Sequence, residues 1–428
     1  MSHNGSIGDQ KNRRREDRLR FLLYSHDGLG LGHVRRNLAI ASALIRAAPE
    51  SSVLLVTGAG DIDRLGLDPG IDVLRLPALR KLPNGRYAAR RLALSRSDLT
   101  ALRAGQIGAA VESFRPDVML VDKHPGGACG ELRPGLRALR AAGGRAVIGF
   151  RDILDDQLHV RREWHSASTP ELIASHYDQV LVYGRRQVFD FEDAYGRWPD
   201  VGRGVRYTGY VVHRTPCHDA AVESVSPFLV APRTHQPVVV ATAGGGEDGD
   251  RLLETFIHAA GSSWQGVVVA GPDMAPDRRH ALRRAAVESG VGFRVFTHDL
   301  ASWLREADAV VCMGGYNTLA EALFRGTPTV CVPRVSPRTE QLIRALAFER
   351  LGLLRVVQPS ALDPVALRGA VAQALDRSRP ELVARAHAAL DFNGASQAAE
   401  WLAELAGRVR GAIPRAPAEG SAVPVGAE

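Results

Sequence analysis

The chain has 428 residues, of which 45% are hydrophobic and 24% are charged. This composition excludes a disordered or fibrous protein, and the length is sufficient for two domains with cores of their own. The formal net charge of +7 favours anionic partners such as phosphates or an acidic membrane surface, although a generally arginine-rich composition accounts for it equally well. No nucleic-acid recognition motif accompanies the charge, so we expect no nucleic-acid partner.

No apolar run approaches the roughly 18 residues of a membrane-spanning helix. The N-terminus lacks the apolar core of a signal peptide, so we expect a cytoplasmic protein. The four cysteines are scattered without zinc-ligand spacing and are expected to be reduced and structural: Cys129, Cys217, Cys312 and Cys331.

In chain order, residues 1–18 are polar with a basic run, which predicts a disordered arm. Apolar runs of strand length then occur at residues 21–24, 53–57, 118–121, 146–150 and 180–183. A second series occurs at residues 238–243, 267–270, 293–296, 309–312 and 329–332. Helical patterns lie between many of these runs. Residues 211–236 contain prolines and no clear periodicity, which is typical of a linker.

Short apolar strands alternating with helices are typical of parallel sheets covered on both faces. The sequence therefore predicts an α/β protein with two Rossmann-like, doubly wound domains at residues 19–210 and 237–385, facing each other across a cleft. Ligands are expected at the carboxyl ends of the strands. Residues 408–428, rich in Pro, Gly and Ala, are expected to form a loose tail.

The first candidate site is a glycine-rich loop between the first strand and the first helix, with Gly28, Gly30 and Gly32 followed by His33. Glycines let a backbone approach a ligand closely. The spacing is not the dinucleotide fingerprint, and a tight strand-to-helix turn also explains it. His33 is expected to face the cleft, where it could take a proton from a hydroxyl. A hydrogen-bonding role at the helix N-terminus is the alternative.

The second candidate is Asp122, which ends a strand at the carboxyl edge of the predicted sheet. A carboxylate there could orient a histidine or act as a base itself. A loop aspartate that accepts local backbone hydrogen bonds is the alternative.

Two glycine-rich motifs stand in the second half. Gly244–Gly246 follows a strand and precedes a helix, as in phosphate- or sugar-contacting loops. Gly314 and Gly315 precede another helix, whose N-terminal N–H groups could bind an anion without a metal. Glu321, one turn into that helix, could reach a polyol such as ribose. Thr318-x-x-Glu321 also fits a capping box, in which Glu321 only satisfies backbone N–H groups.

Residues 237–358 resemble the nucleotide-sugar domain of GT-B glycosyltransferases, in particular the MurG group, the peptidoglycan N-acetylglucosaminyltransferases and their relatives. The motifs that carry this resemblance are Gly244-Gly245-Gly246, Phe296-Thr297-His298-Asp299-Leu300, Ala307-Asp308-Ala309-Val310-Val311-Cys312, Gly315-Tyr316-Asn317-Thr318-x-x-Glu321-Ala322, Gly326-Thr327-Pro328 and Arg338-Thr339-Glu340-Gln341. The N-terminal half is similar more loosely, through the loop ending at His33. The chain also resembles a subfamily known mainly as predicted glycosyltransferases.

The resemblance implies a donor site in the second domain, made of Gly244, Gly245, Gly246, Phe296, Thr297, Gly314, Gly315, Asn317, Thr318, Glu321, Glu340 and Gln341. Phe296 and Thr297 would contact the base, expected to be uracil, and Glu321 would bind ribose. Gly315, Asn317 and Thr318 would meet the diphosphate, helped by Gly245 and Gly246. Glu340 and Gln341 would hold hydroxyls of the transferred sugar. Residues 386–407 are expected to cross back to the first domain.

The expected activity is a metal-independent, inverting transfer of a sugar from a nucleoside-diphosphate sugar to an acceptor hydroxyl, with no cofactor. His33 or Asp122 would be the general base. The Asp-x-Asp pairs Asp61/Asp63 and Asp248/Asp250 lack the strand-end context of a metal site. Retaining members of the fold often carry Glu-x7-Glu, whereas Met313 occupies the first position here. A sugar-nucleotide 2-epimerase of the same fold and a non-catalytic, sugar-nucleotide-binding partner subunit are the alternatives.

The resemblance does not imply which acceptor is used, because the N-terminal loop lacks the Gly-Gly-Thr-Gly-Gly pattern of the peptidoglycan enzyme. Residues 75–103 combine arginines with leucines. Such a surface suits a lipid-linked acceptor and peripheral contact with an anionic membrane. A solvated basic helix and loop is the alternative.

Overall fold

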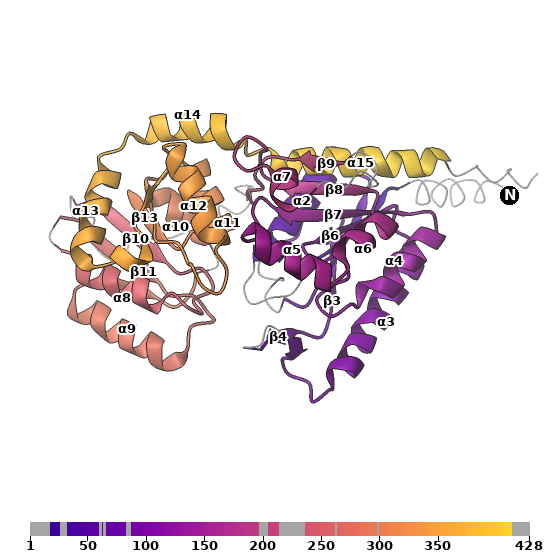
Figure 1. Ribbon diagram of the computed structural model, residues 1–428, viewed down its shortest axis with the longest axis horizontal. Helices are drawn as coiled ribbons and strands as arrows, with labels where there is room; N and C mark the ends of the chain where they lie inside the picture. Colours follow the sequence, from indigo (N-terminus) through magenta and orange to yellow (C-terminus); the bar gives the residue numbers. More distant parts are fainter. Residues whose placement is uncertain are drawn as a thin grey trace, which may run out of the picture.

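The computed structural model describes residues 18–25, 32–59, 62, 66–82, 87–196, 204–213, 236–261, 263–297 and 299–412. They form two α/β domains side by side (Figure 1). Several predicted features lie outside the described residues: Gly28, Gly30, Asp61, Asp63, Cys217, His298, and most of the predicted arm, linker and tail.

The N-terminal sheet is parallel, with strand order β3-β2-β1-β6-β7-β8-β9. Its strands are β1 (Arg20–Tyr24), β2 (Ser52–Thr57), β3 (Ile71–Arg75), β6 (Val118–Asp122), β7 (Arg145–Arg151), β8 (Gln179–Tyr183) and β9 (Val205–Tyr207). One face packs against α2 (Gly32–Ala47). The other face packs against α3 (Arg96–Phe114), α4 (Leu132–Ala141), α5 (Gln157–Ser166), α6 (Thr169–His176) and α7 (Phe191–Tyr195). Both faces are covered, which is why the central strands are apolar throughout.

The C-terminal sheet is also parallel, with strand order β12-β11-β10-β13-β14-β15. Its strands are β10 (Val238–Thr242), β11 (Gln265–Val269), β12 (Gly292–Arg294), β13 (Ala309–Cys312), β14 (Thr329–Cys331) and β15 (Arg355–Val356). One face packs against α8 (Asp250–Ala259), α9 (Pro276–Glu288) and α13 (Pro364–Leu375). The other packs against α10 (Leu300–Glu306), α11 (Tyr316–Phe324), α12 (Glu340–Arg350) and α14 (Arg379–Leu390). A 3-10 turn, η2 (Pro359–Ala361), precedes α13.

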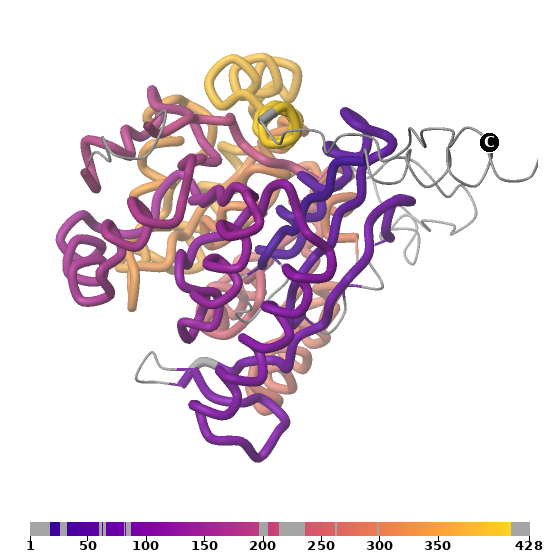
Figure 2. Tube along the Cα trace, turned by 90° about the vertical axis from the view of Figure 1, so that its right-hand side faces the viewer, coloured from indigo at the N-terminus to yellow at the C-terminus, as the bar shows by residue number. Residues whose placement is uncertain are grey.

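The chain crosses between the domains twice, and the two crossings touch. Tyr210 N donates to Asp391 O at 2.7 Å, and Gly394 N donates to Tyr210 O at 3.2 Å. A Cβ at Gly209, where φ is +84°, would lie 2.5 Å from Asp391 O, so the close approach requires glycine there. After the second crossing, α15 (Gly394–Ala412) lies along the N-terminal domain and packs against α2 (Figures 1 and 2).

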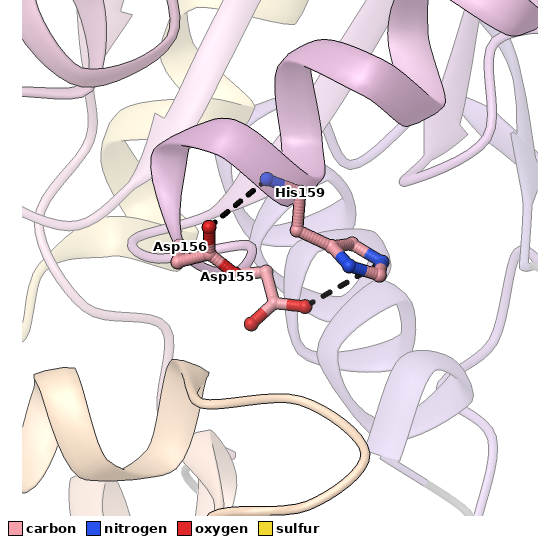
Figure 3. Close-up of side chains that lie close together, drawn as sticks. All are labelled: Asp155, Asp156 and His159. Carbon is pink, nitrogen blue, oxygen red and sulfur yellow. Dashed lines mark hydrogen bonds and ion pairs between the residues drawn. The ribbon is translucent and has the colours of Figure 1, made fainter.

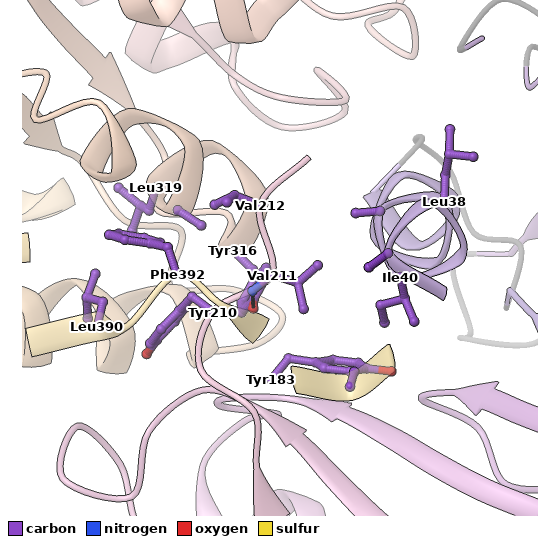
Figure 4. Close-up of a cluster of buried hydrophobic side chains, with 14 of the residues drawn as sticks. Leu38, Ile40, Tyr183, Tyr210, Val211, Val212, Tyr316, Leu319, Leu390 and Phe392 are labelled. Carbon is purple, nitrogen blue, oxygen red and sulfur yellow. Dashed lines mark hydrogen bonds between the residues drawn. The ribbon is translucent and has the colours of Figure 1, made fainter. Parts of the chain in front are cut away.

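The domains share an apolar core at these crossings. Figure 4 shows the segment from Tyr210 to Val212 passing between α11, with Tyr316 and Leu319, and α2, with Leu38. The Tyr210 and Tyr316 rings stack with centroids 5.6 Å apart. One cluster of buried side chains therefore continues from the first sheet into the second domain.

Each strand predicted above is present, with ends within two residues of the expected positions. The strands that the sequence did not reveal are edge strands or short ones: β3, β9, β15 and the antiparallel pair β4 (Leu79–Lys81) and β5 (Tyr87–Ala89). The predicted tail began too early, because α15 continues to Ala412 and Arg410 Nε lies 2.6 Å from Asp117 Oδ1. Residues 386–390 belong to α14 of the second domain, so the return crossing starts at Asp391.

Candidate active site

A cavity of about 330 Å³ opens between the domains, at the carboxyl ends of strands from both sheets. From the first domain, its lining includes Gly32, His33, Arg35, Arg36 and Arg151. From the second, it includes most of the predicted donor residues: Gly244, Gly245, Gly246, Phe296, Thr297, Gly315, Asn317, Thr318, Glu321 and Gln341. Gly314, Glu340 and Asp122 are not part of the lining. The structure thus brings together side chains that the sequence places more than 200 positions apart.

His33 and Asp122 are in direct contact. His33 Nδ1 lies 2.7 Å from Asp122 Oδ2, and the histidine side chain is 17% exposed while the aspartate is fully buried. Arg36, one turn after His33, donates from Nη2 to both Asp122 oxygens, at 2.8 and 2.6 Å. The Asp122 carboxylate therefore holds two side chains of α2 and not local backbone N–H groups. Of its expected roles, orienting the histidine is the one the geometry supports.

The protonation states follow from burial and charge. Burial alone would raise the pKa of Asp122, but Arg36 and His33 outweigh it and hold that pKa well below its usual range. Burial lowers the pKa of His33 to about 4, against the opposing effect of Asp122. At neutral pH Asp122 is ionised and His33 is neutral. Nδ1–H then donates to Asp122, so the basic lone pair is on Nε2, as a general base requires.

Arg36 was not predicted as a site residue. Its guanidinium is buried and lies over two tyrosine rings, 5.1 Å from the Tyr183 centroid and 5.5 Å from the Tyr316 centroid. Tyr183 ends β8, whereas Tyr316 is the first residue of α11 in the other domain. Arg36 therefore connects the His33–Asp122 pair to the second domain. No local signal marks Arg36 as a site residue, because α2 also carries Arg35, Asn37 and Arg46.

The N-terminus of α11 faces the cavity. Gly315 is its N-cap residue, and no side chain caps it. Thr318 and Glu321 are the third and sixth helical residues, whereas a capping box needs them at the N-cap and third positions. The capping-box interpretation is therefore wrong. The N–H groups of this first turn are the type of site that binds anions.

Glu321 is 8% exposed and lines the cavity. Burial raises its pKa, Arg35 opposes that shift and Asp299 adds to it. Asp299 follows Thr297 by two residues, so the predicted ribose contact and the predicted base contacts are neighbours in space. A buried carboxylate aimed into a cavity is suited to accept hydrogen bonds from hydroxyls.

The glycine loops pack against each other through backbone. A Cβ at Gly246, where φ is +93°, would lie 2.5 Å from Ala270 O, and one at Gly271 would lie 2.5 Å from Gly245 O. Only glycine fits at this contact, which brings the turns after β10 and β11 together. On the opposite wall, Asn317 Nδ2 donates to Gly32 O at 3.0 Å, so the end of the N-terminal glycine loop touches α11.

Glu340 and Gln341 begin α12, and Arg334 holds both. Arg334 Nη2 donates to Glu340 Oε1 at 3.0 Å, and the backbone N of Arg334 donates to Gln341 Oε1 at 3.3 Å. Burial alone would raise the pKa of Glu340. The positive charges of Arg151, Arg334 and Arg344 outweigh burial, so the pKa lies below its usual value. Gln341 lines the cavity, while Glu340 lies behind it.

One group of possible metal ligands occurs among the described residues, with atoms within 4.8 Å of one another: Asp155, Asp156 and His159 (Figure 3). One oxygen of each carboxylate accepts a hydrogen bond elsewhere, while Asp155 Oδ2 is buried without a hydrogen-bond partner among the described residues. Asp155 Oδ1 accepts from Thr339 N at 2.8 Å, across the domain boundary, and Asp156 caps α5 through His159 N at 2.9 Å. Asp248 and Asp250 form ion pairs with two different arginines. Asp248 Oδ2 lies 3.4 Å from Arg334 Nη1, and Asp250 Oδ2 lies 3.1 Å from Arg278 Nη1.

Comparison with known proteins relates the chain to glycosyltransferases. Residues 274–402 match the glycosyltransferase family 28 C-terminal domain. A UDP-N-acetylglucosamine–N-acetylmuramyl-(pentapeptide) pyrophosphoryl-undecaprenol N-acetylglucosamine transferase of Solidesulfovibrio magneticus is 24% identical over 380 residues, covering 85% of this chain and 92% of the relative. An uncharacterized glycosyltransferase of Methanopyrus kandleri is 25% identical over 214 residues, which are 50% of this chain and 58% of that protein.

Solved structures agree on the fold. MurG of Acinetobacter baumannii superposes with a TM-score of 0.57 at 15% identity, covering 90% of this chain and 99% of that chain. A calicheamicin glycosyltransferase superposes with a TM-score of 0.59 at 18% identity, covering 92% and 99%. The chain is therefore a glycosyltransferase of the GT-B fold that resembles MurG.

The expected acceptor-side surface of this glycosyltransferase is only partly exposed. Leu76, Leu79 and Leu99 are buried, and so is Arg103, which pairs with Glu131 at 2.9 Å. These residues belong to the core under α3 and were wrongly assigned. The exposed leucines that remain are Leu92, Leu94 and Leu102, at 48%, 39% and 42%. No helix in the described ranges is long and apolar enough to cross a bilayer.

Proposed function

We propose that this protein transfers a sugar from a nucleoside-diphosphate sugar to an acceptor hydroxyl, with inversion at the anomeric carbon. One observation carries the proposal: an Asp122-oriented, neutral His33 faces the uncapped N-terminus of α11 across a single cavity. A base and an anion-binding helix end on opposite walls suit a displacement reaction, in which a proton leaves one reactant and negative charge builds on the other.

In this mechanism His33 Nε2 takes the proton of the acceptor hydroxyl, and the oxygen attacks the anomeric carbon. The bond from that carbon to the diphosphate oxygen breaks, and its electron pair stays on the diphosphate. N–H groups at the start of α11 would stabilise this charge, each well-placed donor contributing about 3 kcal/mol. The proposed transfer therefore uses no metal.

We propose a UDP-sugar as donor. Phe296 and Thr297 line the cavity near Glu321, where a base and its ribose would lie together. The name of the Solidesulfovibrio relative specifies a UDP-sugar. Calorimetric titration with UDP-, ADP-, dTDP- and GDP-sugars tests this choice. We expect the UDP-sugar to bind most tightly, and failure of all four to bind would contradict the proposed function.

Product analysis separates the proposed transferase from the other interpretations. The transferase releases nucleoside diphosphate only when acceptor is present, and its product has the opposite anomeric configuration to the donor. A 2-epimerase would isomerise the donor without acceptor. A binding subunit would retain donor affinity and show no turnover in any variant.

We further propose that the protein lies in the cytoplasm and contacts an anionic membrane, where a lipid-linked acceptor would reside. The exposed Leu92, Leu94 and Leu102 stand among exposed arginines, including Arg91 and Arg96. Apolar side chains flanked by cations suit an anionic bilayer surface. Flotation with vesicles of neutral lipid, with and without phosphatidylglycerol, tests this contact. Binding that does not depend on the anionic lipid would contradict it.

A further inference from the structure

Arg151 has no hydrogen-bonding or ion-pairing partner in the part of the chain that the structure describes. It ends β7 at the carboxyl edge of the first sheet and lines the interdomain cavity. Within the described ranges its guanidinium makes no hydrogen bond or ion pair, and its Nε is buried without an acceptor. Arg151 is half-buried, and a guanidinium partly removed from water normally lies against a carboxylate, a phosphate or carbonyl oxygens. An acceptor for Arg151 is therefore expected to come from a ligand.

Its neighbours have partners of their own. Arg36 is bound to Asp122, and Arg334 is bound to Glu340. Arg344 is held by Asp152, with Nη2 2.7 Å from Oδ1. Burial, then Arg344 and Arg36, lower the pKa of Arg151 to about 10, while Glu340 opposes them. The cavity wall around Arg151 thus carries positive charge that its own carboxylates do not balance.

The contacts of Arg344 indicate at which end of the cavity the positive charge of Arg151 lies. Arg344, the charged group that affects Arg151 most, also donates from Nη1 to Gly314 O at 3.1 Å. Gly314 immediately precedes the N-cap residue of α11. Arg151 therefore lies at the α11 end of the cavity, in the opposite domain from the helix.

We propose that Arg151 is an oxyanion receptor that binds the diphosphate of the donor from the first domain. This proposal rests on the proposed function and extends it. As the bond to the anomeric carbon breaks, the electron pair passes to a phosphate oxygen, and Arg151 donates hydrogen bonds to that oxygen while keeping its own protons. The second domain holds the diphosphate through backbone and the first through a side chain, so donor binding links the two domains. A phosphate group of the acceptor is the other ligand to which Arg151 could donate these hydrogen bonds.

Titrations with inorganic pyrophosphate, UDP and uridine test the assignment in wild type, Arg151→Gln, Arg151→Lys and Arg284→Gln. Arg284 is exposed on α9, outside the cavity lining, and controls for the lost charge. We expect Arg151→Gln to weaken pyrophosphate and UDP binding at least about tenfold and to leave uridine binding unchanged. Arg151→Lys should lose less, which separates charge recognition from a folding defect.

A second titration adds pyrophosphate to enzyme saturated with UDP. If pyrophosphate still binds, and only that binding depends on Arg151, the oxyanion belongs to the acceptor and the donor assignment is wrong. Pyrophosphate and UDP affinities that do not change in Arg151→Gln overturn the receptor itself. Wild type that binds pyrophosphate through Arg151 but no nucleotide sugar would contradict the proposed function and leave the receptor standing.

Discussion

His33 Nδ1 lies 2.7 Å from Asp122 Oδ2, although 89 positions separate the two residues. The topology explains this contact. β6 pairs with β1 in parallel, with Tyr24 opposite Val121, so Asp122 ends β6 at the edge of the sheet where the chain leaves β1 toward α2. A doubly wound sheet brings these ends together without any local sequence signal that links them.

The first prediction concerns this pair. His33→Ala removes the proposed base, and Asp122→Asn removes the carboxylate that fixes its tautomer, so each should lower kcat by about 10²–10⁴-fold. Rates of nucleoside diphosphate release at saturating donor measure the effect. Donor affinity, followed by titration, should stay near that of wild type, because neither change touches the second domain. Full activity in His33→Ala would rule out the histidine as base.

The second prediction concerns Arg36 and pH. Catalysis needs neutral His33, whose pKa of about 4 places the acid limb of kcat/KM near pH 4, with activity lost as the pH falls through that value. Arg36 is among the charges that lower this pKa. Arg36→Met should therefore move the limb to higher pH, because Asp122 then acts on His33 without compensation. Arg36→Lys keeps the charge and should move it less. A limb that stays in place in Arg36→Met would contradict the assignment.

The third prediction separates binding from stability at Glu321. Glu321→Gln should weaken donor binding about tenfold or more, since hydrogen bonds to charged groups contribute about 1.5–3 kcal/mol. The free energy of unfolding should not fall. The pKa of Glu321 is raised in the folded state, so its ionisation opposes folding increasingly as the pH rises above about 4.5.

Titration calorimetry and chemical denaturation at pH 7 measure the two effects in Glu321→Gln. Its gain in stability over wild type should shrink as the pH is lowered toward 4, where the glutamate regains its proton. Unchanged donor affinity together with lost stability would instead assign Glu321 a purely structural role.

The fourth prediction concerns the contact between domains. Arg344 is fully buried, and its Nε and Nη2 both donate to Asp152 of the other domain. Arg344→Met leaves Asp152 buried without its cation and should cost about 3–5 kcal/mol of stability. The double variant Asp152→Asn/Arg344→Met should be more stable than Arg344→Met, because no unpaired charge remains. Denaturant unfolding monitored by tryptophan fluorescence and circular dichroism tests this order, and equal stability of the single and double variants would contradict it.

Much of the proposed donor site could be predicted from the sequence, because its residues are close together along the chain. Gly315, Asn317, Thr318 and Glu321 lie within one strand–loop–helix unit, where the spacing along the chain fixes the spacing in space. The capping-box alternative for Glu321 stayed open until the helix start was known. One residue of shift in that start changes which N–H groups a side chain can reach.

The arginines could not be predicted. Arg36, Arg151 and Arg344 look in the sequence like three of many surface cations, and nothing local distinguishes them from Arg284. Arg103 is a further example. The sequence placed it on a membrane-facing surface, but it is buried and paired with Glu131. A charge is buried only when the fold supplies its partner, and that partner is usually distant in the chain.

By itself, the sequence determined two parallel sheets, their order along the chain and the glycine-rich helix start that would receive a diphosphate. Strand period and turn chemistry are local properties, and short-range sterics and hydrogen bonding set them. Only the tertiary structure decided that His33 meets Asp122, that Arg36 lies between tyrosines of both domains, and that Arg151 finds no acceptor among the described residues. Those contacts depend on which strands become neighbours and how the two domains pack, and burial then sets the charge that each group carries.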